Sequence, residues 1–149
     1  MKELVFIEKQ KFHQIWVWGI LIISLIVSLI TAKVNLGILL ASMLPMVFLY
    51  ILSLNVKISK SGIHYQFFPL HRKVYSIKLD EIDRFEEITY SPIRDYGGWG
   101  IRYGFKGKAY NVSGNKGVKI YLKNSKKSIL FGSQRSKEFA SVLDNLMRQ

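Results

Sequence analysis

Two long apolar runs, free of charged residues, occupy most of the first third of the chain. The first run, IWVWGILIISLIVSLITA, covers residues 15–32, and the second, VNLGILLASMLPMVFLYILSL, covers residues 34–54. A helix of about 20 residues crosses a hydrocarbon core of about 30 Å, and shorter helices manage by drawing in their flanks. Only a short turn around Lys33 separates the runs. The sequence therefore predicts an antiparallel transmembrane hairpin.

The residues that flank the two runs support this interpretation. Trp16, Trp18 and Tyr50 lie near the ends of the runs, where aromatic rings favour the headgroup region. A cleaved signal peptide has a shorter apolar segment, and the remaining residues are too few to bury both helices in one soluble core. More lysines flank the runs than lie in the turn. The positive-inside rule then predicts a multi-pass protein of the cell membrane, the inner membrane in a bacterium, with both termini in the cytoplasm.

Beyond Leu54 the hydrophobic period changes to two, as in Ile63, Tyr65 and Phe67. Such alternation indicates strands with one buried face. Turn-forming sequences such as GNKG at residues 114–117 separate the alternating segments. The sequence predicts seven antiparallel strands, at residues 55–60, 62–68, 72–78, 82–90, 99–112, 117–123 and 127–132.

The period changes once more near the C-terminus. Phe139, Val142, Leu143 and Leu146 recur at helical spacing, which predicts an amphipathic helix over residues 134–147. A helix of this size and position is typical of one that packs across the open end of a β-barrel. Contact with a membrane or with a partner protein is the alternative role for its apolar face.

These elements predict a membrane-anchored α+β protein in two parts. The N-terminal flank and the transmembrane hairpin occupy residues 1–54, and a β domain with its C-terminal helix occupies residues 55–149. The β domain is expected to be a seven-stranded antiparallel barrel or sandwich.

Two stretches carry a resemblance to a known group of proteins. They are YSPIRDYGGWGIRYG, at Tyr90 to Gly104, and GKAYNVSGNKGVKIYL, at Gly107 to Leu122. With the overall plan, they resemble the small bacterial integral membrane proteins that carry a pleckstrin-homology-like domain behind a two-helix membrane anchor. The resemblance implies the pleckstrin-homology-like fold for residues 55–148 and implies no activity. Some domains of this fold bind phosphoinositides, but a fold alone does not transfer that function.

The charge of the chain is concentrated in the predicted β domain. The whole chain has a net charge of +12, and from Lys57 onward eighteen Lys and Arg stand against eight Asp and Glu, a net of +10. A basic domain held near an anionic leaflet gains about 1 kcal/mol for each basic residue at the surface. A solvated face is the alternative interpretation. The residues predicted to contact an anionic surface are Lys106, Lys108, Lys116, Lys119, Lys123, Lys126, Lys127 and Arg135.

A smaller candidate site lies within the first of the two resembling stretches. Arg94 and Arg102 are suited to bind a phosphate or a carboxylate, and Asp95 and Trp99 are the polar and aromatic residues beside them. Structurally, the GGWG sequence at 97–100 is explained more simply as a tight turn or bulge between strands. The sequence is compatible with both interpretations, and in the functional one the predicted ligand-binding residues are Arg94, Asp95, Trp99 and Arg102.

Catalytic and metal-binding patterns are weak in this sequence. The chain has no Cys and three His, and the acidic run DEIDRFEE at residues 80–87 matches no calcium loop. No catalytic residue, metal site or cofactor is predicted, and the protein is expected not to be an enzyme. A nucleic-acid partner is not expected either, because the predicted anchor ties the domain to a membrane.

Two hypotheses for function remain. In the first, the domain is a binding module for anionic lipid or another anionic ligand at the cytoplasmic face of a membrane. In the second, the protein is a scaffold or accessory subunit of a membrane protein complex and uses a strand edge or the helices to hold its partner.

Overall fold

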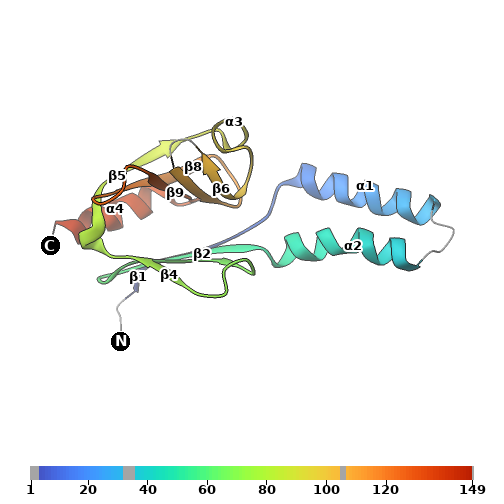
Figure 1. The fold of residues 1–149 in the computed structure, drawn as a ribbon, viewed down its shortest axis with the longest axis horizontal. Coiled ribbons are helices and arrows are strands. Elements are labelled where there is room, and N and C mark those ends of the chain that lie inside the picture. The colour runs from blue at the N-terminus through green and yellow to red at the C-terminus, as the bar shows by residue number, and fades with distance from the viewer. Residues whose placement is uncertain (1–3, 32–35, 105–106, 149) are drawn as a thin grey trace.

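A computed structural model describes residues 4–31, 36–104 and 107–148. This part of the chain forms two β-sheets, four α-helices and one 3₁₀ turn (Figure 1). In chain order the elements are β1 (Leu4–Lys11), α1 (Ile15–Thr31), α2 (Leu36–Ile51), β2 (Ser53–Ser59), β3 (Gly62–Phe68), β4 (Tyr75–Ile77), η1 (Leu79–Glu81), β5 (Ile82–Thr89), α3 (Pro92–Tyr96), β6 (Gly100–Gly104), β7 (Gly107–Asn111), β8 (Lys116–Leu122), β9 (Ser128–Gly132) and α4 (Ser136–Met147).

The strands form two sheets that face each other across one core. The first sheet has the order β1-β2-β3-β4, and all of its pairs are antiparallel. The second has the order β5-β8-β9-β7-β6, in which β7 and β9 are parallel and the other pairs antiparallel. Alternate residues of β2 and β3, such as Val56, Ile58 and Ile63, are fully buried, and Phe131 of β9 lies in the same cluster.

The helix α4 packs along one open side between the two sheets and contacts β1, β5 and β8. Its buried Phe139 and Leu143 enter the core, and the ring centroids of Phe139 and Phe6 lie 5.3 Å apart. The apolar periodicity of residues 134–147 therefore predicted this helix and its packing role well. Its observed bounds are Ser136–Met147.

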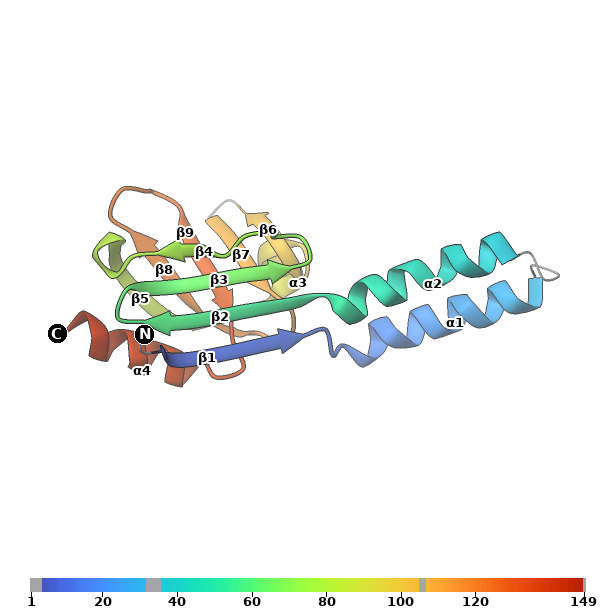
Figure 2. The same cartoon turned by 90° about the horizontal axis from the view of Figure 1, so that it is seen from below.

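The helices α1 and α2 form an antiparallel hairpin that projects from one end of the β domain (Figures 1 and 2). The hairpin is inserted between β1 and β2, which pair side by side from Lys11↔Ser53 outward. Because the chain leaves the sheet at β1 and returns at the neighbouring β2, both ends of the hairpin are fixed at the same place.

The predicted transmembrane spans are wrong. Within the described ranges, no helix combines the length and the apolar character needed to cross a membrane. The helix α1 has 17 residues and α2 has 16, which corresponds to about 26 Å and 24 Å at about 1.5 Å per residue, against a hydrocarbon core of about 30 Å. The predictions of a multi-pass membrane protein and of cytoplasmic termini depended on those spans and are not supported.

The second span was predicted too long because its last residues belong to a strand. Ser53 and Leu54 lie in β2, and both Leu52 and Leu54 are buried in the core of the β domain. The apolar run at 34–54 therefore joins a helix to a core strand. Periodicity alone does not separate the two, because a buried strand and a buried helix are both continuous in apolar residues over such a short stretch.

The predicted seven-stranded antiparallel barrel or sandwich is also wrong in its number of strands and in its pairing. The described residues form nine strands, and the pairing of β7 with β9 is parallel. The predicted strand at 99–112 is divided into β6 and β7, and the first strand, β1, was placed in the N-terminal flank instead of in the sheet. The α+β class remains, now with two sheets and four α-helices.

Gly107 makes the parallel pairing possible. Its φ is +140°, and a Cβ built there would lie 2.0 Å from the carbonyl oxygen of Ser128 in β9. Gly97, which ends α3 with φ of +71°, has open space where a Cβ would be. A side chain at Gly97 would therefore add backbone strain alone, whereas one at Gly107 would add both backbone strain and a steric clash.

We expect Gly107→Ala to lower the free energy of unfolding by about 3 kcal/mol or more, because it adds a clash with the β9 backbone to the strain of a positive φ. The matched Gly97→Ala variant should lose only about 1 kcal/mol. Urea denaturation followed by circular dichroism measures both. Equal losses in the two variants would show that β7 and β9 do not approach as closely as described.

Candidate functional site

The strand β1 turns two polar side chains into the domain. Val5 and Ile7 are 46% and 50% exposed, whereas Glu8 and Gln10 are only 6% and 4% exposed. Glu8 and Gln10 thus lie on the inner face of the strand together with the buried Phe6. The buried carboxylate of Glu8 requires compensating hydrogen bonds, so the residues that bond to it form the first candidate site.

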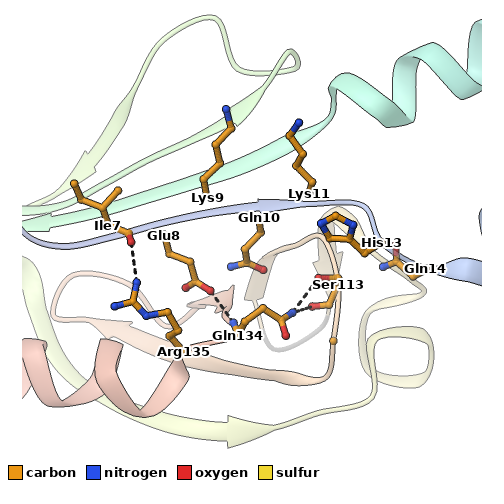
Figure 3. Close-up of a pocket in the computed structure, with 11 residues that line it drawn as sticks. Ile7, Glu8, Lys9, Gln10, Lys11, His13, Gln14, Ser113, Gln134 and Arg135 are labelled. Carbon is orange, nitrogen blue, oxygen red and sulfur yellow. Dashed lines mark hydrogen bonds between the residues drawn. The ribbon is translucent and has the colours of Figure 1, made fainter.

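These partners come from the segment between β9 and α4 (Figure 3). The Ser133 hydroxyl donates to Glu8 Oε2 at 2.6 Å, and the Gln134 backbone N–H donates to Oε1 at 2.8 Å. Gln10 Nε2 donates to the Gly132 carbonyl at 2.6 Å. The two ends of the chain are therefore joined by hydrogen bonds across more than 120 positions of sequence.

A shallow hollow opens beside these hydrogen bonds. Figure 3 shows Lys9 and Lys11 pointing away from Glu8 and Gln10, as alternate residues of a strand must. The hollow is lined by Ile7, Glu8, Lys9, Gln10, Lys11, His13, Gln14, Ser113, Gly114, Gln134 and Arg135. Some of its polar groups bond to one another, for example Gln134 Nε2 to Ser113 Oγ at 2.9 Å, whereas the buried Oε1 atoms of Gln10 and Gln14 have no partner among the described residues. The inner part of the hollow is therefore a structural contact between β1 and the rest of the domain.

The outer face of the first sheet is basic. Lys9 and Lys11 of β1, Lys57 of β2 and His64 of β3 alternate with the buried residues of their strands, and Lys57 is the register partner of both Ile7 and His64. The inward direction of Glu8 leaves no Asp or Glu on this outer face in the described parts of β1 to β4. The described part of this face therefore carries basic side chains and no acidic one.

Aromatic residues gather where the hairpin joins the β domain. The Trp16 and Trp99 ring centroids lie 6.0 Å apart, and Trp99 Nε1 donates to the Gly114 carbonyl at 3.2 Å. Gln14 Nε2 donates to the Val112 carbonyl. These contacts, which we call the base clamp, hold the first turn of α1 against the loop between β7 and β8.

The other helix, α2, contributes an aromatic ring to the same region, and a lysine of β1 lies over that ring. Lys11 Nζ lies 5.3 Å from the centroid of the Tyr50 ring, in the last turn of α2. Trp18 Nε1 donates to the Phe12 carbonyl at 3.3 Å. Tryptophan and tyrosine rings, each of which carries one polar group, thus lie with Lys11 at the base of the hairpin.

Away from its base, the hairpin exposes large apolar side chains around its surface. Neither helix has a buried residue among those described, and neither contains a charged residue. The exposed large apolar residues of the two helices are Ile15, Trp16, Ile20, Ile22, Ile23, Ile26, Val27, Leu29, Ile30, Leu36, Ile38, Leu40, Met43, Leu44, Val47, Phe48, Tyr50 and Ile51.

The structure does not bring the four predicted ligand-binding residues into one site. The Arg94 side chain is 85% exposed and lies 3.6 Å from the Asp95 carboxylate, which also accepts from the Ser91 N–H at 2.7 Å. Arg102 Nε donates to the Trp99 carbonyl at 3.0 Å. Trp99 belongs to the base clamp, whereas Arg94 and Asp95 line a separate shallow hollow.

The basic residues predicted to contact an anionic surface are similarly dispersed. Lys127 lines the same hollow as Arg94. Lys108 lies over the rings of Tyr103 and Tyr110, at 5.0 and 4.7 Å, and Lys119 lies over Tyr121 at 5.1 Å. The remaining predicted residues are Lys116 at the start of β8, Lys123 and Lys126 in the turn between β8 and β9, Arg135 beside β1, and Lys106, which lies outside the described residues.

Burial shifts the pKa of several aromatic groups, among them Tyr90 and His71. Burial raises the pKa of Tyr90 to about 12. Burial and the nearby Lys108 lower the pKa of His71, whose Nδ1 accepts from the Phe67 N–H at 3.3 Å. Both shifts favour the neutral form, so these groups contribute to packing and not to the surface charge. In the described residues, no cluster of three or more His, Cys, Asp or Glu is suited to hold a metal ion.

Comparison with known proteins finds no matching family model, no matching curated protein and no matching solved structure. The resemblance to pleckstrin-homology-like membrane proteins therefore stays a prediction.

Sequence reasoning missed the hairpin base as a site. Its members lie far apart in sequence. Trp16, Trp18 and Tyr50 were singled out as residues at the ends of the apolar runs, and Trp99 as part of a separate ligand-binding prediction. The available signal was the small number of tryptophans, which are Trp16, Trp18 and Trp99. Their common position at the hairpin base is apparent only from the fold.

The base clamp predicts a specific effect of losing one hydrogen-bond donor. We expect Trp99→Phe to increase amide hydrogen exchange several-fold in residues 112–116, because the ring is retained but the bond to the Gly114 carbonyl is lost. Trp18→Phe removes a bond to Phe12 instead and should leave that loop unchanged. Exchange measured by mass spectrometry decides this, and identical loop exchange in both variants would exclude the clamp.

Proposed function

We propose that this protein is a non-enzymatic binding module for an anionic lipid surface. In this proposal the hairpin of α1 and α2 enters the apolar part of the lipid without crossing it, and the basic residues around its base contact the headgroups. The observation that carries the proposal is the apolar surface of the hairpin on all sides, directly next to a base of aromatic and basic residues.

The apolar surface supports this proposal because water is a poor environment for it. A helix that is hydrophobic all round is normally buried, either in a protein core or in lipid. Full burial of one large aliphatic side chain contributes about 1.5–3 kcal/mol. Association costs about 4–15 kcal/mol, so burial of about ten of the exposed side chains is enough to offset that cost.

The charges support lipid of negative charge over neutral lipid. Lys9 and Lys11 lie on the outer face of the first sheet, in the part of β1 nearest the hairpin. Each basic residue near an anionic leaflet contributes about 1 kcal/mol. These two lysines therefore add about 2 kcal/mol, which is a smaller contribution than that of the hairpin but one that depends on lipid charge and on salt.

A second candidate function is supported by one observation on α2. Gly37, Ala41 and Leu44 line an apolar hollow on this helix, and small residues allow close helix packing. A scaffold or accessory subunit would use this hollow to hold a helix of a partner protein. The experiment below separates the two functions.

The test is flotation of the full chain, transferred out of a mild detergent, with vesicles of phosphatidylcholine alone or mixed with phosphatidylglycerol. We expect flotation with the mixed vesicles and a weaker association at 0.5 M salt. Charge reversal at Lys9 and Lys11 (Lys9→Glu, Lys11→Glu) should weaken the apparent affinity by roughly tenfold or more.

The matched control reverses Lys123 and Lys126 in the turn between β8 and β9, which lies away from the helices (Figure 2). This control should bind as the unaltered chain does. Absence of flotation with either vesicle would reject the lipid function and leave the scaffold function. Equal weakening by both charge reversals would reject the assignment of the basic face.

A further inference from the structure

The end of the β domain that carries the hairpin has apolar residues of its own. Phe68, the last residue of β3, and Leu70, in the turn after it, are 47% and 53% exposed, and Ile93 of α3 is 62% exposed. Both views place the turn between β3 and β4, and the helix α3, at the end from which α1 and α2 project (Figures 1 and 2). Two separate loops thus present apolar residues beside the hairpin base.

Cations accompany these apolar residues. Arg72 and Lys73 follow Leu70 in the same turn, and Arg94 follows Ile93 in α3, and all three are exposed. Asp95 is the acidic residue nearest in sequence to this set; its carboxylate accepts from the Ser91 N–H and lies 3.6 Å from Arg94, whose side chain is still 85% exposed. Apolar side chains next to basic ones are typical of surfaces that lie at the boundary between acyl chains and headgroups.

The base clamp keeps this end of the domain in a fixed relation to the hairpin. Trp99 follows α3 within three residues and contacts Trp16 of α1, while Gln14 bonds to the loop between β7 and β8. A hairpin that enters lipid therefore brings the clamped end of the domain to the same surface. The domain has little freedom to turn its loops away.

We infer that the β3–β4 turn and α3 form a second contact with the same lipid surface, in which Phe68, Leu70 and Ile93 enter the headgroup boundary and Arg72, Lys73 and Arg94 contact phosphates. This inference rests on the proposed function. In this arrangement a lipid phosphate is the ligand of Arg94. The domain is oriented end-on, with its hairpin end against the lipid surface, so that the hairpin is not its only contact with the lipid.

The chain has no Cys, so a single cysteine can carry an environment-sensitive fluorophore in the full-length protein. The labelling positions are Leu70→Cys and Ile93→Cys for the inferred contact, Leu44→Cys for the hairpin, and Ser125→Cys in the β8–β9 turn as the control. All four residues are exposed, so labelling them leaves the core intact.

With phosphatidylcholine and phosphatidylglycerol vesicles, we expect a blue shift and about a twofold rise in emission at positions 70, 93 and 44, and no change at 125. A response at position 44 without one at 70 and 93 would overturn this inference and leave the proposed function standing. No response at any position would overturn both. A response at 125 equal to that at 70 would overturn the end-on orientation.

A second measurement uses affinity. Replacement of both residues in the turn (Phe68→Ser, Leu70→Ser) should weaken binding to the mixed vesicles by roughly tenfold, because two apolar side chains no longer enter the boundary. The control makes the same replacement at two residues of β1 that are exposed to a similar degree (Val5→Ser, Ile7→Ser). This control should leave the affinity unchanged. Unchanged affinity in the turn variant would overturn the inference.

Discussion

The pairing of β1 with β2 is the constraint on which the rest of this structure depends. The strand β1 runs directly into α1, and α2 runs directly into β2, so the register Lys11↔Ser53 holds the two ends of the helical insertion side by side. The helices must therefore leave and re-enter the domain at one place. The direction of the hairpin, the meeting of Trp16 with Trp99 and the contact of Lys11 with Tyr50 all follow from this pairing.

Hydrophobicity alone does not decide the register of β1. A shift of one residue would turn Val5 and Ile7 inward and Glu8 outward, but it would also expose Phe6 and turn Lys9 and Lys11 inward. The observed register is stabilised by polar partners that only this arrangement supplies: the Ser133 hydroxyl and the Gln134 N–H for Glu8, and the Gly132 carbonyl for Gln10. Bonds to a charged group contribute about 1.5–3 kcal/mol each, which is comparable to the burial of an aliphatic side chain.

Regular periodicity was enough to predict much of the β domain. The alternation in residues 62–68 gave β3 at its observed bounds, Gly62–Phe68, and the helical spacing near the C-terminus gave α4. The β1 strand was not predictable in this way, since it buries Glu8 and Gln10, whose hydrogen-bond partners lie more than 120 residues away. The parallel pairing of β7 with β9 was equally hidden, because strand order is a property of the fold and not of either segment.

The apolar runs show that hydropathy can predict an element without predicting where it ends. Hydropathy identified the helices correctly but not their lengths, because Leu52 and Leu54 continue the apolar run while they belong to the buried edge of the β domain. The candidate site was only partly visible for a similar reason. Arg94 and Trp99 were recognisable as notable residues, but the structure assigns them to different surroundings, a shallow hollow and the base clamp.

Together, the apolar hairpin, the aromatic base and the basic outer face give the protein a definite polarity along its long axis. The three tryptophans of the chain, Trp16, Trp18 and Trp99, all lie at the hairpin base, so their native fluorescence reports on this region without any substitution. The most direct test of the proposed lipid contact is quenching of this fluorescence by phospholipids that carry bromine at different depths, in vesicles containing phosphatidylglycerol. Our account predicts the strongest quenching by bromine placed near the headgroup boundary. Emission that is the same with brominated and unbrominated lipids would contradict it.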